Sequence, residues 1–260
     1  MAFLLLPVQG NAGETGNRRY LTLGGGWAHS GLRDRGLSPL YYSGDHAYIT
    51  SGFLKQSGNT INLLEINFLR GSIAPALYPA LTESVMTNMN GEISISHLRL
   101  ARGMLNNRLD FFIGGKLSAK LGFYEHNLFV NSSRTDYSIT TLNLSSRLIY
   151  TFVNDRREYL LELQLYFPAA AIIVRPAHAY IKPSGFLDHS TGNLGSVINS
   201  IEVSTVNRYF GLGTDISLEY PVSKNNALRL GYRWAYSDHQ NSNQLQSAMH
   251  GIILQSTFNF

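Results

Sequence analysis

Apolar and polar residues alternate along most of this chain, which is the pattern of β-strands with one apolar and one polar face. The clearest case runs from 109 to 123, where Leu, Phe and Ile alternate with Asp, Lys and Ser. Similar alternation occurs at 136–152, 157–167, 210–220, 228–236 and 252–260. Weaker alternation predicts four further strands at 19–30, 47–56, 61–70 and 92–102. The sequence therefore predicts about ten strands, within a range of eight to twelve.

One of the weaker strands changes face along its length. In 92–102 the isoleucines at 93 and 95 take one face and the leucines at 98 and 100 take the other. A β-bulge inserts one residue and reverses the alternation beyond it, so we expect a bulge near Ser96 and His97.

The chain ends in an alternating strand that closes on an aromatic residue. Ile252, Leu254, Phe258 and Phe260 share one face, and only Ser256 interrupts the pattern. This segment resembles the closing strand of Gram-negative outer-membrane β-barrels. In that family, the carboxy-terminal aromatic residue looks like the signal that the barrel-assembly machinery reads. The resemblance implies that Phe258 and Phe260 serve assembly.

The connectors between the predicted strands alternate in length. Short connectors fall near 57–59, 105–107, 154–155 and 222–226, and long ones at 31–46, 71–91, 124–135, 168–203 and 237–246. Bacterial barrels have short periplasmic turns and long outer loops, and an even strand number leaves both termini periplasmic. The sequence predicts an all-β protein, a single antiparallel transmembrane β-barrel over 13–260, integral to the bacterial outer membrane and surrounded by its lipid.

Composition supports a single β-rich domain. The 260 residues include 24 Gly, 15 Tyr and 13 Phe, and only 15% are charged. After the amino terminus, no window approaches the roughly 18 consecutive apolar residues of a membrane-spanning helix. Residues 1–12 join an apolar run to small residues, and we interpret them as the remnant of a signal peptide.

The sequence gives little sign of cofactor or nucleic-acid chemistry. The chain has no cysteine, which excludes disulfides and thiolate metal sites. It contains neither a glycine-rich phosphate loop nor a motif of metal ligands, so we expect no cofactor and no metal. The net charge of +4 is spread along the chain, so we expect no nucleic-acid partner.

Charged residues on the polar faces match across two predicted hairpins. With turns at 154–155 and around 224, opposite charges meet in three pairs: Arg147 with Glu162, Glu219 with Arg229, and Asp215 with Arg233. Opposite charges on facing strands stabilise a sheet, and about ten strands leave a narrow lumen. We expect these pairs to hold the lumen together.

Two lysines have no acidic residue on the neighbouring predicted strands. Lys116 and Lys120 share the polar face of 109–123, and Arg99 and Arg102 lie on the strand before it. If the bulge turns the arginines inward, the lumen has a basic side that favours anions. Alternatively, the lysines reach acids across the barrel or interfacial phosphate.

The connector 168–203 is both long and apolar, which argues against disorder. It extends the flanking strands, folds into the mouth as a cap, or binds a partner. The connector 71–91 is suited to pack beside it. We expect an extracellular ligand or protein to be contacted through these two connectors.

Acid–histidine dipeptides occur at the predicted rim: Asp45-His46, Asp188-His189 and Asp238-His239. Omptin proteases resemble this chain in strand number and use Asp and His at the rim. However, neighbouring residues in a strand point apart, and the chain has no Asp-x-Asp pair on adjacent strand tops. We expect the dipeptides to be solvated loop residues.

A lipid-modifying site is the other enzymatic alternative, with Ser94, Ser96 and His97 as its candidates. The His-x-Ser-Asn pattern of barrel lipases is missing. The sequence therefore favours a non-enzymatic protein of surface interaction or envelope structure, with at most a small pore. The alternative is a rim-active hydrolase, either an omptin-like protease or a lipid esterase.

Overall fold

The computed structural model describes residues 18–35, 38, 40–77, 84–104, 108–126, 134–154, 157–175, 201–223, 225–240 and 244–260. The predicted signal remnant at 1–12 and much of the connector 168–203 lie outside these residues. The strands are β1 (Arg18–Asp34), β2 (Tyr42–Ser57), β3 (Thr60–Pro75), β4 (Met86–Met104), β5 (Leu109–His126), β6 (Arg134–Asn154), β7 (Arg157–Val174), β8 (Ile201–Thr205), β9 (Tyr209–Pro221), β10 (Asn226–His239) and β11 (Leu245–Asn259). No helix in the described part of the chain is long and apolar enough to cross a membrane.

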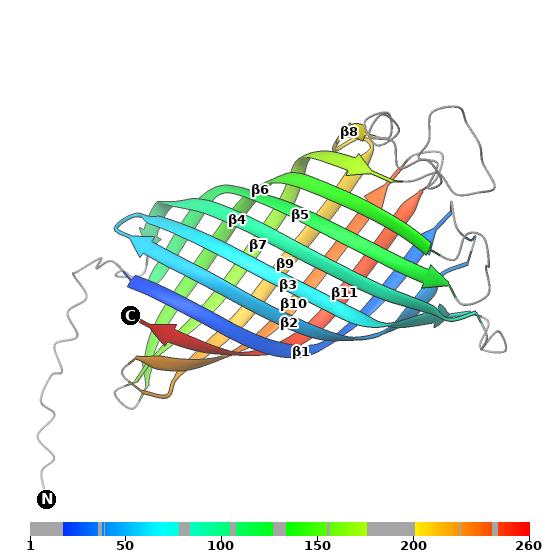
Figure 1. Ribbon diagram of the computed structural model, residues 1–260. Helices are drawn as coiled ribbons and strands as arrows, with labels where there is room; N and C mark the ends of the chain where they lie inside the picture. Colours follow the sequence, from blue (N-terminus) through cyan, green and yellow to red (C-terminus); the bar gives the residue numbers. More distant parts are fainter. Residues whose placement is uncertain are drawn as a thin grey trace, which may run out of the picture.

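Ten of these strands form a closed antiparallel barrel (Figure 1). Each strand pairs with its neighbours in sequence, and β1 pairs with β11 to close the circle. The short strand β8 stands outside this count: it pairs with the end of β7, beyond the part of β7 that pairs with β9. The prediction of an all-β, ten-stranded barrel is confirmed.

The two ends of the barrel differ. Short turns join β2 to β3, β4 to β5, β6 to β7 and β9 to β10 at one end, which we call the turn end. β1 begins and β11 ends at this same end (Figure 1). In the tightest turn Ser57 pairs with Thr60, and Gly58 takes a positive φ of 53° that side chains disfavour. The other end, the loop end, carries the longer connectors.

The connectors at the loop end are shorter than the sequence predicted. β3 continues to Pro75 and β4 begins at Met86, so 71–91 is largely strand. Likewise, β7 continues to Val174. β8 occupies 201–205, so it begins within the predicted connector 168–203 and ends just after it. Of the alternatives for that connector, extension of the flanking strand applies to its first residues. The alternation on which the prediction depended is lost at these ends, because 86–91 is mostly polar and 169–174 is uniformly apolar.

The outer wall is apolar and the inner wall is polar. On β6, Leu142 and Leu144 point outward and are 55% and 65% exposed, whereas Thr141, Asn143 and Ser145 are buried in the interior. Aliphatic side chains cover the outer face in the same way on every barrel strand. Such a wall suits lipid on the outside and a hydrogen-bonded interior.

Aromatic side chains border this apolar wall at both ends. Ring contacts at the turn end join Phe53 to Phe260 and run through Tyr150, Phe152, Tyr159 and Tyr220. At the loop end, Phe210 contacts both Phe167 and Tyr236. Two aromatic girdles around an apolar band are characteristic of transmembrane barrels, where they lie at the two membrane interfaces.

Inside the barrel, apolar clusters lie at both ends. The loop-end cluster comprises Leu32, Tyr42, Ile73, Met86, Tyr124, Tyr137, Ile139, Ala171, Ile173, Tyr209 and Leu245. The turn-end cluster comprises Leu54, Ile61, Leu63, Leu98 and Phe112, with Tyr20, Leu100 and Ile149 packed against it. Polar and charged residues fill the rest of the interior, together with a third apolar cluster of Ala28, Tyr48, Leu69 and Ile253. The interior is therefore layered, which the sequence did not predict.

The predicted bulge near Ser96 and His97 is wrong. The β4–β5 register shifts only between Leu100 and Arg102. Ser96 and Leu98 both point inward, and His97 points outward, so the alternation continues through this region. The prediction failed because it assumed that inward residues are polar, whereas Leu98 and Leu100 belong to the turn-end cluster.

The predicted register of the β6–β7 hairpin is wrong by two residues. Asn154 pairs with Arg157, and Arg147 therefore faces Gln164, not Glu162. The turn lies one residue later than predicted. A shift of two residues preserves the faces, so every side chain keeps its inward or outward direction.

Candidate functional site

The lumen is crossed by an ion-pair network centred on Arg233 of β10. Its guanidinium lies 2.5 Å from Asp215 on β9, the neighbouring strand, and 3.2 Å from Glu65 on β3, on the far wall. It also donates to the hydroxyl of Tyr48 on β2. Lys116 of β5 approaches Glu65 to 3.6 Å. We call these four charged residues and Tyr48 the Arg233 network.

A second network lies nearer the turn end. Arg229 contacts Glu219 at 2.7 Å and Glu162 at 3.1 Å, and Arg147 contacts Glu162 at 2.5 Å. The pair Arg147–Glu162 thus forms diagonally in spite of the register shift. We call these four residues the Arg229 network.

The two networks are electrically balanced, because each holds two cations and two anions. Lys116, which we expected to lack a neighbouring acid, reaches Glu65 two strands away and also lies 4.3 Å from the ring centre of Tyr166. Arg99 is exposed on the outer face. For Lys116 the structure therefore agrees with the alternative that a lysine reaches an acid across the barrel. A basic lumen side formed by Lys116 and Lys120 stays a prediction.

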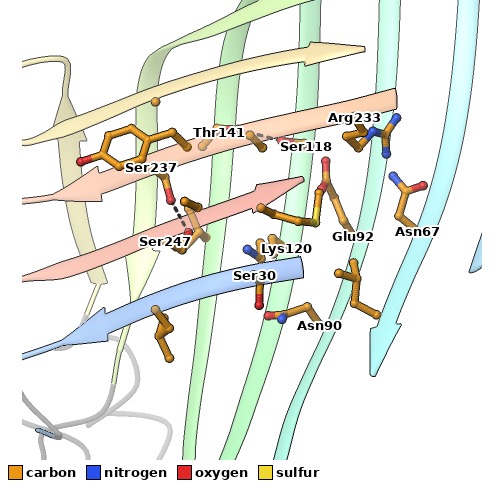
Figure 2. Close-up of a pocket in the computed structure, with 18 of the residues that line it drawn as sticks. Ser30, Asn67, Asn90, Glu92, Ser118, Lys120, Thr141, Arg233, Ser237 and Ser247 are labelled. Atoms are coloured by element: carbon orange, nitrogen blue, oxygen red, sulfur yellow. Dashed lines mark hydrogen bonds between the residues drawn. The ribbon is translucent and has the colours of Figure 1, made fainter. Parts of the chain in front are cut away.

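A cavity of about 130 Å³ lies between the Arg233 network and the loop-end cluster (Figure 2). On the wall formed by β10, β11 and β1, it is lined by small side chains, including Ala235, Ser237, Ser247 and Ser30. The opposite wall, formed by β4, β5 and β6, supplies larger ones, including Tyr124 and Tyr137. Larger side chains such as Arg233 and Met249 also line the first wall, and smaller ones such as Ser118 and Thr141 the second.

Two opposite charges face this cavity without contacting each other. Glu92 of β4 and Lys120 of β5 pair directly in the backbone register, and both line the cavity (Figure 2). No ion pair within 4 Å joins them or links either one to another described residue. Lys120 lies 5.9 Å from the ring centre of Tyr137.

The cavity wall also carries an unused hydrogen-bond donor. Asn67 of β3 is 2% exposed, and its Oδ1 accepts a 2.8 Å hydrogen bond from Thr50. Its Nδ2 has no hydrogen-bond partner. Buried donors are nearly always satisfied, so an unsatisfied one beside a cavity calls for an explanation.

The rim dipeptides do not form catalytic dyads within the described residues. His46 is buried, faces inward and accepts from Asn88 at 3.1 Å, while Asp45 is on the outer face. His239 lies 3.3 Å from Glu202 on β8, not beside Asp238. Asp188 and His189 lie outside the described residues. The prediction of solvated loop residues is wrong for the other two dipeptides, because they belong to β2 and β10, and His46, Asp238 and His239 are buried. The long strands reach further toward the loop end than the alternation indicated.

The lipid-esterase candidates are separated by the wall of the barrel. Ser94 and Ser96 are buried inside, and His97 is outside, where its Nδ1 lies 2.7 Å from Oδ1 of Asn62. A serine and a histidine on opposite faces cannot exchange a proton directly.

A different carboxylate–histidine contact lies on the outer wall. His29 Nδ1 is 2.7 Å from Asp45 Oδ1, and the ring of His250 is 5.7 Å away. No described serine or threonine hydroxyl bonds to His29. No group of three metal-ligating side chains gathers in the described part of the chain.

The sequence analysis missed Glu65, Asn67 and Glu92. A signal was present for the first two, because Glu65 and Asn67 alternate with Leu64, Ile66 and Phe68 and so belong to the polar face. The contact between Glu65 and Arg233 carried no local signal, because these residues are on strands that are not neighbours.

Comparison with solved structures identifies the fold. The outer-membrane protease OmpT from Escherichia coli is similar with a TM-score of 0.53 and 8% identity, over 95% of this chain and 97% of OmpT. The translocator domain of autotransporter NalP from Neisseria meningitidis has a TM-score of 0.47 and 9% identity, over 94% of this chain and 89% of that domain. The transport unit of autotransporter AIDA-I from Escherichia coli has a TM-score of 0.44 and 10% identity, over 99% of this chain and 94% of that unit.

No protein-family model matches the chain, and no curated protein matches it in sequence. The closed ten-stranded barrel, its apolar wall and the likeness to OmpT define the fold as that of outer-membrane β-barrels. The likeness to OmpT extends to the fold alone.

Proposed function

We propose that this protein is a non-enzymatic, integral protein of the bacterial outer membrane with a closed lumen. It acts at its loop end, in surface interaction or envelope structure, and both termini are periplasmic. The observation that carries this proposal is the filled interior, in which two ion-pair networks lie between two apolar clusters.

The filled interior argues against a porin. Arg233 lines both the 130 Å³ cavity and a smaller cavity of about 70 Å³. Its bonds to Glu65, Asp215 and Tyr48 cross the lumen between the two cavities. A wider vestibule of about 490 Å³ lies at the turn end. A solute crossing the barrel would have to break buried ion pairs, each of which is costly to leave uncompensated.

The loop end is braced as a support for a binding surface. Arg175, just after β7, contacts Asp34 of β1 at 2.7 Å across the mouth. Glu202 of β8 contacts both His239 at 3.3 Å and Arg208 at 3.9 Å. Rigid scaffolds that carry variable connectors are a common arrangement for recognition. We therefore assign contact with an extracellular ligand or protein to 71–91 and 168–203.

Enzymatic function is the weaker alternative. A hydrolase needs a nucleophile or an activated water held beside a general base. The contacts His29–Asp45 and His239–Glu202 supply an oriented histidine. Ser204 donates to Glu202 at 3.2 Å, but no hydroxyl among the described residues is hydrogen-bonded to either histidine.

The test has two arms. Purified, refolded barrel is inserted in planar bilayers, where we expect no porin-like conductance steps. In parallel, a variant shortened within 176–200 is compared with a variant shortened within 128–132 for adhesion of cells that display the protein. Loss of adhesion with the first variant alone supports the proposal. Large open channels, or hydrolysis of peptides or lipid esters by the purified barrel, would reject it.

A further inference from the structure

We propose that the 130 Å³ cavity is a binding site for a small zwitterionic solute of the amino-acid type. The solute places its ammonium group at Glu92 and its carboxylate oxygens at Lys120 and the Asn67 amide. This inference concerns the lumen and is independent of the surface role proposed above.

The first step is the charge arrangement. Glu92 and Lys120 face each other across one strand pairing, yet they form no ion pair and both point into the cavity (Figure 2). Every member of the Arg233 and Arg229 networks has an oppositely charged group within 4 Å. Glu92 and Lys120 are partly buried, and Lys120 has the neutral hydroxyl of Tyr137 as a hydrogen-bond partner. Removing a charge from water without an opposite charge beside it is costly. A zwitterion supplies a partner to both charges at once and adds no net charge to the lumen.

The second step is the unsatisfied donor. Asn67 lines the same cavity, Thr50 binds its Oδ1, and its buried Nδ2 has no hydrogen-bond partner. Neighbouring atoms cover Nδ2, so the side chain has to shift slightly for its N–H to reach an acceptor in the cavity. A carboxylate oxygen provides one, and an apolar solute of the same size does not.

The third step is size. An apolar cavity of roughly 150 Å³ holds benzene, which has six non-hydrogen atoms. The cavity here, at about 130 Å³, is therefore suited to a solute of similar size. Glycine and alanine meet this limit and carry both charges. The tyrosines of the wall, Tyr124 and Tyr137, leave an apolar surface for a short side chain.

The experiment measures binding of alanine and glycine to the folded barrel in detergent by calorimetry. Acetate and methylammonium, which each carry one of the two charges, serve as comparison solutes. Solutes are added both before and after folding, so that slow entry through the loop end does not hide binding. We expect saturable binding of alanine, and binding of each singly charged solute that is weaker by about tenfold or more, because one charge-assisted hydrogen bond is lost.

Two kinds of variant identify the site. Glu92→Gln and Lys120→Gln should each abolish alanine binding, whereas Glu158→Gln in the turn-end vestibule should leave it unchanged. Ala235→Leu fills the cavity and should also abolish binding, and Ala119→Leu on the outer face of β5 is its matched control. Heat-dependent gel migration verifies that each variant is folded.

The inference is overturned if neither alanine nor glycine binds under either order of addition, which would mean that only water fills the cavity. It is equally overturned if acetate or methylammonium binds as well as alanine. Unchanged binding by folded Glu92→Gln or folded Ala235→Leu would also reject it, since the solute would then be held elsewhere.

Discussion

Arg233 of β10 reaches across the lumen to Glu65 of β3, with 3.2 Å between Nη2 and Oε1. The two residues are on opposite walls, and three strands, β11, β1 and β2, separate their strands around the barrel. This contact fixes the two walls relative to each other and places a guanidinium in the middle of the lumen. Because Arg233 also holds Asp215 and Tyr48, its removal affects three partners at once.

Replacing Arg233 with glutamine should therefore destabilise the barrel and open a path between the two cavities that it lines. Leaving buried carboxylates uncompensated costs about 3–5 kcal/mol of unfolding free energy. Denaturant unfolding followed by tryptophan fluorescence measures the loss, and bilayer recording measures the conductance. Arg99→Gln on the outer wall is the control and should change neither. If Arg233→Gln matches the wild type in both measurements, the contact across the lumen is not formed.

The pair Glu219–Arg229 allows a test by charge exchange. The two residues face each other in the β9–β10 register and lie 2.7 Å apart. Glu219→Arg should lower the unfolding free energy by roughly 3–5 kcal/mol, and adding Arg229→Glu should recover much of the loss. Recovery should be incomplete, because Arg229 also contacts Glu162. Simple additivity of the two changes in a double-mutant cycle would show that they do not interact.

Deletion of Phe260 should reduce the amount of inserted barrel in cells far more than it reduces the stability of purified barrel. The side chain is 70% exposed, contacts the ring of Phe53, and contributes little buried area. Outer-membrane content is measured by fractionation and heat-dependent gel migration, and stability by refolding in vitro. Deletion of Met1 is a control at the other terminus. Equal membrane content with and without Phe260 would remove the assembly role that we expect for it.

The triple variant His46→Gln, His189→Gln and His239→Gln should leave hydrolysis of peptides and lipid esters at the background of the wild type. We add His29→Gln separately, because His29 is the outer-wall histidine that contacts Asp45. Loss of a general base usually costs on the order of 10²–10⁴ in rate, so a catalytic role would be easily seen. A wild-type activity that disappears in either variant would favour the hydrolase.

The sequence predicted the strands and their faces, because both depend on local alternation. It also predicted that Glu219 faces Arg229, because a short connector between β9 and β10 fixes the register. The β6–β7 register was missed by two residues, since a turn displaced by one position leaves the alternation unchanged.

The candidate site was less accessible to sequence analysis than the fold. The interior site depends on which residues of non-neighbouring strands meet, and this follows from the tilt and stagger of the closed barrel. Glu65 and Arg233 are 168 residues apart, so no local pattern links them. The apolar layers were missed for another reason. Alternation shows which residues share a face of the strand, but it does not show whether a leucine such as Leu98 faces the lumen or the lipid.

The strand β8 gives the mouth of the barrel a property that a closed barrel otherwise lacks. Closure pairs the backbone of every barrel strand on both sides, whereas β8 pairs, among the described residues, with β7 alone. One row of its amide and carbonyl groups therefore has no strand partner among the described residues, and Val203 is 69% exposed. An open edge can accept an extended segment as an additional strand, through backbone hydrogen bonds that do not depend on the sequence of that segment. At the loop end, recognition by main-chain pairing is thus available alongside recognition by side chains.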